Sequence, residues 1–158
     1  MTTVDDLLAA GARVLADVAP DEEIAELRRR GAGGELVLQR CANCGYLRYP
    51  PAPLCPECLS REASWVSDPG TGEIWSFCVY HRAFTKPFAD LVPYVVALVV
   101  LDSGPQLITN VVDRLPDQVH IGQRGVAAPR ALPEGGSLIY FTVTEQPKDE
   151  GRQPWPTR

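Results

Sequence analysis

The stretch CANCGYLRYPPAPLCPEC, residues 41–58, holds four of the five cysteines of this 158-residue chain. These thiols form two C-x-x-C steps separated by ten residues: Cys41, Cys44, Cys55 and Cys58. Each step lets one tight turn present two sulfurs to the same ion, and four thiolates are a common ligand set of structural zinc. Because four protein ligands leave no position open for water or substrate, we predict one zinc ion with a structural role.

Two alternatives to zinc would use the same residues. Iron in a rubredoxin-like site takes the same four ligands, although a closed site of four thiolates favours zinc. Two disulfides would require an oxidising compartment. The first residues, MTTVDDLLAAGARVL, lack the charged and then apolar pattern of a signal segment. We therefore expect a cytoplasmic protein whose thiols stay reduced.

The residues before the cysteines predict a helical arm and hinge over residues 1–34. Thr3 and Asp6 can form a capping pair at the start of a first helix, and Asp21 can cap a second one. Apolar residues of the first helix recur along one stripe, which must be covered because short isolated helices are marginal in water. We expect the arm to dock on a partner subunit or a second copy; the alternative is that it packs on its own domain.

The residues after the cysteines predict a small antiparallel barrel, because five segments rich in β-branched and aromatic residues follow one another with turns between them. The segments are EIWSFCVYHR (73–82), PYVVALVVLD (93–102), PQLITNVVD (105–113), DQVHIGQRGVAA (117–128) and SLIYFTVTEQ (137–146). No convincing helix separates them, so the five-stranded OB-fold is the leading type. The predicted fold class is mainly β: the helical arm, a rubredoxin-like zinc ribbon over residues 35–66, an OB-fold over 67–146 and a polar tail over 147–158.

Composition argues against several classes of function. The formal net charge is −5, whereas a nucleic-acid binder normally shows a basic footprint. The longest apolar run, YVVALVVL, is far too short to cross a bilayer. The chain has only two histidines, His81 and His120, and we expect Cys78 to be a small buried hydrophobe rather than a nucleophile. We therefore expect no autonomous active site, and neither nucleic acid nor membrane as a partner.

The order of motifs resembles one family closely. GELVLQRCANCG, the pair Pro50–Pro51, CPEC, GTGEIWSFCVYHRAF, PYVVALVVLDSG and LITNVVD follow one another as in the acyl-CoA-associated proteins that join a rubredoxin-like zinc ribbon to an OB-fold. This family is catalogued as domain of unknown function thirty-five. The resemblance covers residues 35–145, and the PYVVALVVLDSG strand and turn are its most specific part. The chain departs from it at Ala52, where the family often has a basic residue.

The resemblance implies a non-catalytic accessory subunit. Members of the family are bound to thiolase-superfamily enzymes, among them thiolases and the lipid-transfer-type aldolases that cut steroid side-chain CoA thioesters, and some are fused to hydratase domains. The implied role is to stabilise the partner and to help form an acyl-CoA channel in lipid or steroid side-chain degradation. The catalytic residues would then belong to the partner.

The candidate contacts with acyl-CoA lie in and beside the loop after the first barrel strand. His81, Arg82 and Lys86 are candidates for polar contacts with the phosphates, and Phe84 and Tyr94 are candidates for an apolar channel wall. The alternative function is a nucleic-acid-binding protein made of a zinc ribbon and an OB-fold, in which aromatic rings would stack on the bases of a single strand. The acidic net charge argues against this alternative.

Overall fold

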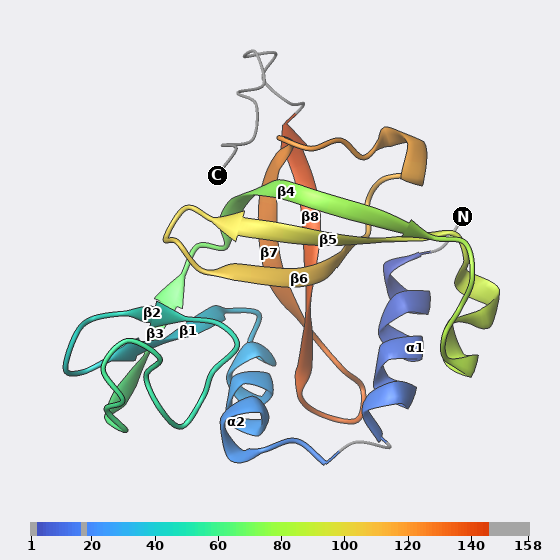
Figure 1. Cartoon of the computed structure of the whole chain (residues 1–158). Helices are drawn as coiled ribbons and strands as arrows, with labels where there is room; N and C mark the ends of the chain where they lie inside the picture. Colours follow the sequence, from blue (N-terminus) through green and yellow to red (C-terminus); the bar gives the residue numbers. More distant parts are fainter. Residues whose placement is uncertain (1–2, 17–18, 146–158) are drawn as a thin grey trace.

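The computed structural model describes residues 3–16 and 19–145, which form two helices, a small sheet and a barrel (Figure 1). The helices are α1 (Val4–Ala16) and α2 (Glu22–Gly31), and the small sheet, in the order β2-β1-β3, contains β1 (Leu36–Cys41), β2 (Leu47–Arg48) and β3 (Ala63–Asp68). The closed barrel, in the order β4-β5-β6-β8-β7, contains β4 (Thr71–Tyr80), β5 (Tyr94–Leu101), β6 (Gln106–Val111), β7 (Arg124–Ala131) and β8 (Ser137–Glu145). Two short 3-10 helices, η1 (Lys86–Leu91) and η2 (Pro116–Gln118), lie in the barrel loops. The predicted fold class is confirmed, while the tail predicted over 147–158 lies outside the described residues.

The barrel has the strand order of an OB-fold. β4, β5 and β6 form an antiparallel meander, β6 and β8 pair in parallel, and β7 closes the barrel by pairing with both β8 and β4. Every second residue of β5 from Val95 to Leu101 is buried, and Phe141 of β8 is fully buried among them. Leu36 and Leu38 of β1 belong to the same core cluster. The ribbon and the barrel therefore share one hydrophobic core.

A β-bulge in β4 decides which side chains of this strand face the interior. The pairing register with β5 shifts between Ile74 and Ser76. Ile74 is fully buried, and after the shift Phe77 and Val79 pack against the core. Strict alternation from Ile74 would have placed Cys78 inside, but the extra residue reverses the phase. The prediction of a buried Cys78 is therefore wrong, and this side chain is exposed on the outside of the barrel.

The fourth barrel strand begins later than predicted. We expected it from residue 117, but β7 starts at Arg124. The fully buried side chain of Gln123 holds the preceding residues in a loop: its amide donates to the Gln118 carbonyl oxygen and accepts from the His120 N–H. These side-chain hydrogen bonds replace the ladder that a strand would form.

Both helices of the arm pack on their own chain. α1 contacts η1 and β8, and Leu7 and Ala10 on its inner side are buried (Figure 1). The approach to β8 is so close that a Cβ atom on Gly11 would collide with the Leu138 side chain. Part of the apolar stripe of α1 is therefore covered by its own chain, as in the alternative; docking of the arm on a partner or a second copy stays a prediction.

The helix α2 forms the seam between the ribbon and the barrel. It contacts β1 on the ribbon side and both β7 and β8 on the barrel side. The Ser137 hydroxyl of β8 donates to the Arg28 carbonyl oxygen at 2.9 Å. On the ribbon side, the Arg30 guanidinium lies 5.6 Å from the centre of the Trp65 ring, which is a cation–π contact. The two parts are therefore held together by side-chain packing as well as by the chain connection.

Candidate functional site

The structure brings the four predicted zinc ligands together in the ribbon. All four Sγ atoms lie within 4.8 Å of one another, and the Cys41–Cys58 and Cys44–Cys55 sulfur pairs are each 3.6 Å apart. A tetrahedral zinc ion with metal–sulfur bonds of about 2.3 Å requires sulfurs about 3.8 Å apart. None of the four cysteines forms a disulfide. The donor set and its spacing therefore fit a four-coordinate zinc ion.

The two C-x-x-C turns have the same backbone hydrogen bonds. In the first, the Cys41 N–H donates to the Tyr46 carbonyl oxygen and the Gly45 N–H donates to the Cys41 carbonyl oxygen. In the second, the Cys55 N–H donates to the Ser60 carbonyl oxygen and the Leu59 N–H donates to the Cys55 carbonyl oxygen. The two turns therefore share one backbone geometry around their first cysteines.

The second turn places a leucine where the first places a glycine. Gly45 has a φ of +75°, and Leu59, which is 71% exposed, has a φ of +60°. The left-handed conformation costs a residue with a Cβ about 1–2 kcal/mol. A glycine at this position would avoid the strain but would lose more conformational freedom on folding, so it would recover only part of this cost.

We expect Leu59→Gly to raise the stability of the zinc-bound protein by up to about 1 kcal/mol, because it relieves this strain. Urea unfolding of the zinc-loaded protein measures the change. Leu59→Ala is the matched control, because it removes the same exposed side chain but keeps the strained backbone. A Leu59→Gly protein that is less stable than Leu59→Ala would contradict the prediction.

The surroundings of Cys41 and Cys44 shift the pKa values of these two thiols in opposite directions. The N–H of Cys44 faces the Cys41 sulfur and is the main cause that lowers the pKa of Cys41 to about 6. The Tyr46 N–H acts in the same direction on Cys44, but desolvation and the neighbouring sulfurs outweigh it and raise the pKa of Cys44 to about 12. A divalent metal ion removes this conflict, because its charge stabilises all four thiolates together.

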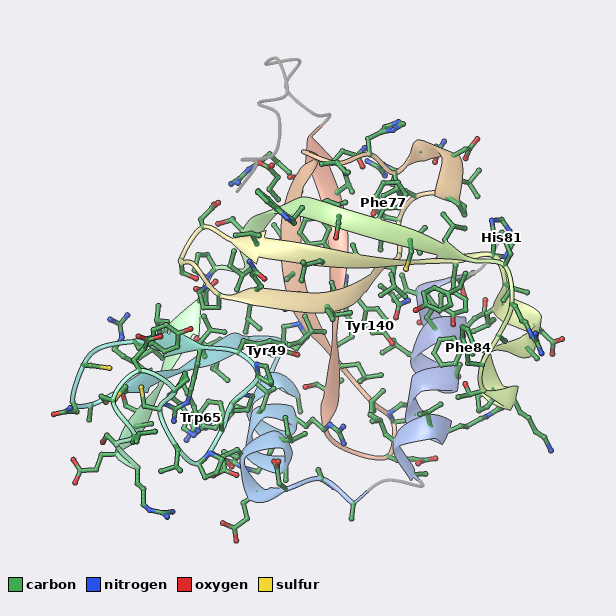
Figure 2. The ribbon with its side chains drawn as sticks, viewed as in Figure 1. Tyr49, Trp65, Phe77, His81, Phe84 and Tyr140 are labelled. Carbon is green, nitrogen blue, oxygen red and sulfur yellow. The ribbon has the colours of Figure 1, made fainter. Side chains whose placement is uncertain are left out.

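The candidate CoA contacts lie where the sequence suggested, in the loop after β4. His81 and Arg82 follow the strand directly, Lys86 begins η1, and all three side chains are exposed. None of them takes part in the ion pairs found within the described residues. Figure 2 shows His81 and Phe84 at the same end of the barrel. The loop therefore presents cationic and aromatic groups together.

Four aromatic rings form a cluster at this end of the barrel. Tyr80 stacks on Tyr94 with ring centres 5.1 Å apart and an interplanar angle of 2°. Phe84, which is 79% exposed, meets Tyr80 edge-on at 5.7 Å, and Phe88 lies tilted against Tyr94 at 5.2 Å. Desolvation raises the pKa of Tyr94 further above neutrality. Phe84 and Tyr94 were predicted as channel-wall residues from the sequence, but the cluster was not. The signal for it is that Tyr80 ends β4 and Tyr94 begins β5, so the two rings face each other in register.

On the outside of β4, β5 and β6, the region beyond the β4 bulge forms a continuous surface, which we call the outer face; Glu73, paired with Val100, lies before the bulge and outside this surface. Its strand pairs place these side chains on one side of the sheet: Ser76, Cys78, Tyr80, Tyr94, Val96, Leu98, Ile108 and Asn110. Not one of these eight residues is acidic or basic, and Ile108 is 71% exposed. The corresponding face of an OB-fold that binds single strands combines aromatic rings with a basic groove. The uncharged outer face therefore argues against the nucleic-acid alternative.

Within residues 3–16 and 19–145, neither α-helix combines the length and apolar composition needed to cross a bilayer.

Sequence comparisons identify both parts of the fold. Residues 30–63 match the family model described as "ChsH2, rubredoxin-like zinc ribbon domain", and residues 65–126 match "ChsH2, C-terminal OB-fold domain". A DUF35 domain-containing scaffold protein of Methanothermobacter thermautotrophicus is 34% identical over 116 residues, which cover 72% of this chain and 86% of the relative. A solved structure titled "Ltp2-ChsH2(DUF35) aldolase" contains a chain that is 36% identical, with a TM-score of 0.70, and the match covers 80% of this chain and 98% of that one.

Two longer relatives contain a similar unit. The probable enoyl-CoA hydratase alpha subunit of Thermomonospora curvata is 47% identical over 87 residues, which cover 55% of this chain and 27% of the relative. The 3-oxo-4,17-pregnadiene-20-carboxyl-CoA hydratase alpha subunit of Mycobacterium tuberculosis is 36% identical over 88 residues, which cover 56% of this chain and 27% of the relative. The chain thus spans about a quarter of the length of these two hydratase subunits.

Proposed function

Because this chain belongs to the DUF35 family, we propose that it is a non-catalytic subunit of a thiolase-superfamily enzyme that acts on an acyl-CoA thioester by thiolysis or retro-aldol cleavage. The observation that carries this proposal is the likeness to a chain of the Ltp2-ChsH2(DUF35) aldolase over 98% of that chain. The partner supplies the catalytic residues, and this chain stabilises it and helps form the acyl-CoA channel. The pregnadiene-carboxyl-CoA hydratase among the relatives supports a steroid or other lipid substrate. A hydratase is a further candidate partner, and the complex would work in the cytoplasm.

The functional units in this proposal are the zinc ribbon over residues 35–66 and the OB-fold over 67–146, with residues 1–34 as the arm and 147–158 as a polar tail. Zinc bound by the four cysteines has a structural role, because all four positions of the tetrahedron are occupied by protein sulfurs.

We place the partner on the outer face. The centre of a stable protein interface is depleted in charge and contains large apolar anchors. The outer face has this character: Ile108 projects from β6, and its register partner Leu98 lies half-buried on the central strand β5. The occupant in this proposal is the thiolase-superfamily subunit, because the similar solved chain comes from the structure of an aldolase, Ltp2-ChsH2(DUF35).

The loop after β4 would then contact the CoA end of the substrate at the edge of this interface. Arg82 and Lys86 can meet phosphates as charge-assisted donors, and His81 can add a third polar contact. Phe84 projects beside them and is supported by Tyr80, so it can form part of the channel wall. One charge-assisted contact contributes about 1.5–3 kcal/mol, so its loss weakens CoA binding by about tenfold or more.

The test combines this chain with the thiolase-superfamily protein encoded nearest to it, and measures assembly by light scattering and acyl-CoA turnover by steady-state kinetics. We expect Ile108→Glu to weaken assembly by at least about thirtyfold, since truncating an interface anchor costs about 2 kcal/mol or more. Ala131→Glu, which adds the same charge at an exposed position of β7, should assemble normally. Arg82→Ala should leave assembly intact and raise KM for acyl-CoA about tenfold. Arg61→Ala, on the ribbon, should change neither assembly nor KM.

Two outcomes would refute the proposal, and two more would refute its interface. The isolated partner could be as stable and as active as the complex, or the small chain could turn over acyl-CoA by itself. An unchanged complex with Ile108→Glu, or a wild-type chain that only pairs with a second copy of itself, would refute the outer face as the site of the partner.

A further inference from the structure

We propose that Arg48 is a positioning residue and the counter-charge of the metal centre. Arg48 is only 5% exposed. Its Nε donates to Gln39 Oε1 and its Nη2 donates to the Ala52 carbonyl oxygen, each at 2.8 Å. Its Nη1 is buried without a hydrogen-bond partner, and none of the ion pairs within the described residues includes this arginine. A buried charge without a carboxylate beside it requires another source of compensation.

The geometry of the ribbon points to the four sulfurs as that source. Gln39 and Cys41 are two residues apart on β1, so their side chains lie on the same face of the sheet. Arg48 is the direct register partner of Gln39, and its side chain therefore shares this face. Alternate residues of a strand lie about 7 Å apart, so Gln39, which accepts from the guanidinium, and Cys41, a predicted zinc ligand, are nearest neighbours on this face.

Arg48 also holds the chain segment that delivers the second pair of ligands. Gln39 Oε1 accepts from the Ala52 N–H at 3.0 Å while it accepts from Arg48. The side chains of β1 and β2 are thus tied to the backbone of Ala52, three residues before Cys55. This junction fixes the distance between the strand that carries Cys41 and the loop that leads to Cys55.

This junction also has an electrostatic role. Four thiolates around one divalent ion carry a formal charge of about −2, and a buried positive charge on the same face of the sheet stabilises that centre. In return, the centre compensates the charge that no carboxylate neutralises. Binding of the metal and burial of Arg48 therefore favour each other.

The experiment measures the rate at which the full-length, zinc-loaded chain releases zinc to a chelator. We expect Arg48→Met to release zinc at least about tenfold faster than wild type, and Arg48→Lys, which keeps the charge, to recover part of this loss. Arg40→Met is the matched control, since Arg40 is exposed and lies on the other face of β1, next to Cys41; it should change the rate by less than about twofold.

A second variant separates the charge from the packing. Gln39→Glu keeps the size of the side chain and both of its accepted hydrogen bonds, but places a carboxylate against Arg48. If Arg48 acts as counter-charge, Gln39→Glu releases zinc faster, because the new carboxylate cancels the positive charge that stabilises the zinc–thiolate centre. If Arg48 is merely structural, the new ion pair tightens the junction and zinc release slows. Slower release from Gln39→Glu, or wild-type release from a folded Arg48→Met protein, would overturn the proposal.

Discussion

Replacing Cys58 with serine should abolish tight zinc binding and lower the stability of the whole chain. Serine keeps its proton at neutral pH, so the tetrahedron loses one of its four anionic ligands. Structural zinc contributes about 10–16 kcal/mol in zinc-finger peptides, and even a quarter of this exceeds about 2 kcal/mol. Because Leu36 and Leu38 of the ribbon pack into the barrel core, we expect the loss to lower the thermal midpoint of the barrel as well.

Native mass spectrometry and thermal unfolding measure these two effects. Cys78→Ser is the matched control: it makes the same chemical change at an exposed cysteine outside the metal site, and should retain one zinc ion per chain. A Cys58→Ser protein that binds zinc as tightly as wild type, or a Cys78→Ser protein that loses zinc, would contradict the assignment of the ligands.

Replacing Gly70 with alanine should be the most damaging single change outside the metal site. Gly70 joins β3 of the ribbon to β4 of the barrel and has a φ of +71°. Its carbonyl oxygen accepts from the Ala127 N–H at 2.8 Å, and a Cβ would collide with the Ala127 carbonyl oxygen. Since that oxygen is backbone, only a shift of β7 could relieve the clash. We expect a loss of at least about 3 kcal/mol, the range of severe packing and backbone defects.

Denaturant unfolding of Gly70→Ala and Gly34→Ala separates the clash from the backbone strain. Gly34 has a similar φ of +85°, but a Cβ there would meet nothing within 4 Å. Gly34→Ala should therefore cost only about 1 kcal/mol, which is the conformational term alone. Equal losses in the two variants would show that the contact with β7 is not what makes Gly70 necessary.

Features with a local cause could be predicted from the sequence. The Thr3 hydroxyl accepts from the Asp6 N–H while the Asp6 carboxylate accepts from the Thr3 N–H, and Asp21 accepts from the Ile24 N–H. These caps follow from residue types three positions apart. The spacing of the cysteines likewise predicted a ligand cluster that the fold brings together.

Features that depend on distant parts of the chain could not be predicted. The exposure of Cys78 follows from a bulge at the preceding Ile74–Ser76 step, and nothing in the local sequence marks this bulge. The late start of β7 follows from the burial of a single amide, that of Gln123. The sequence shows the apolar stripe of α1 but not which residues pack against it, because only the folded barrel places Leu138 against Gly11.

The seam made by α2 has a consequence for the energetics of assembly. A binding protein whose two parts turn freely must lose that freedom when a partner contacts both of them, and the lost entropy weakens the complex. Here the Arg30–Trp65 contact and the Ser137–Arg28 hydrogen bond restrict that rotation in the isolated chain. A partner that touches the ribbon and the barrel together therefore meets a single preorganised surface, and small changes in α2 would weaken its affinity without altering any residue that it touches.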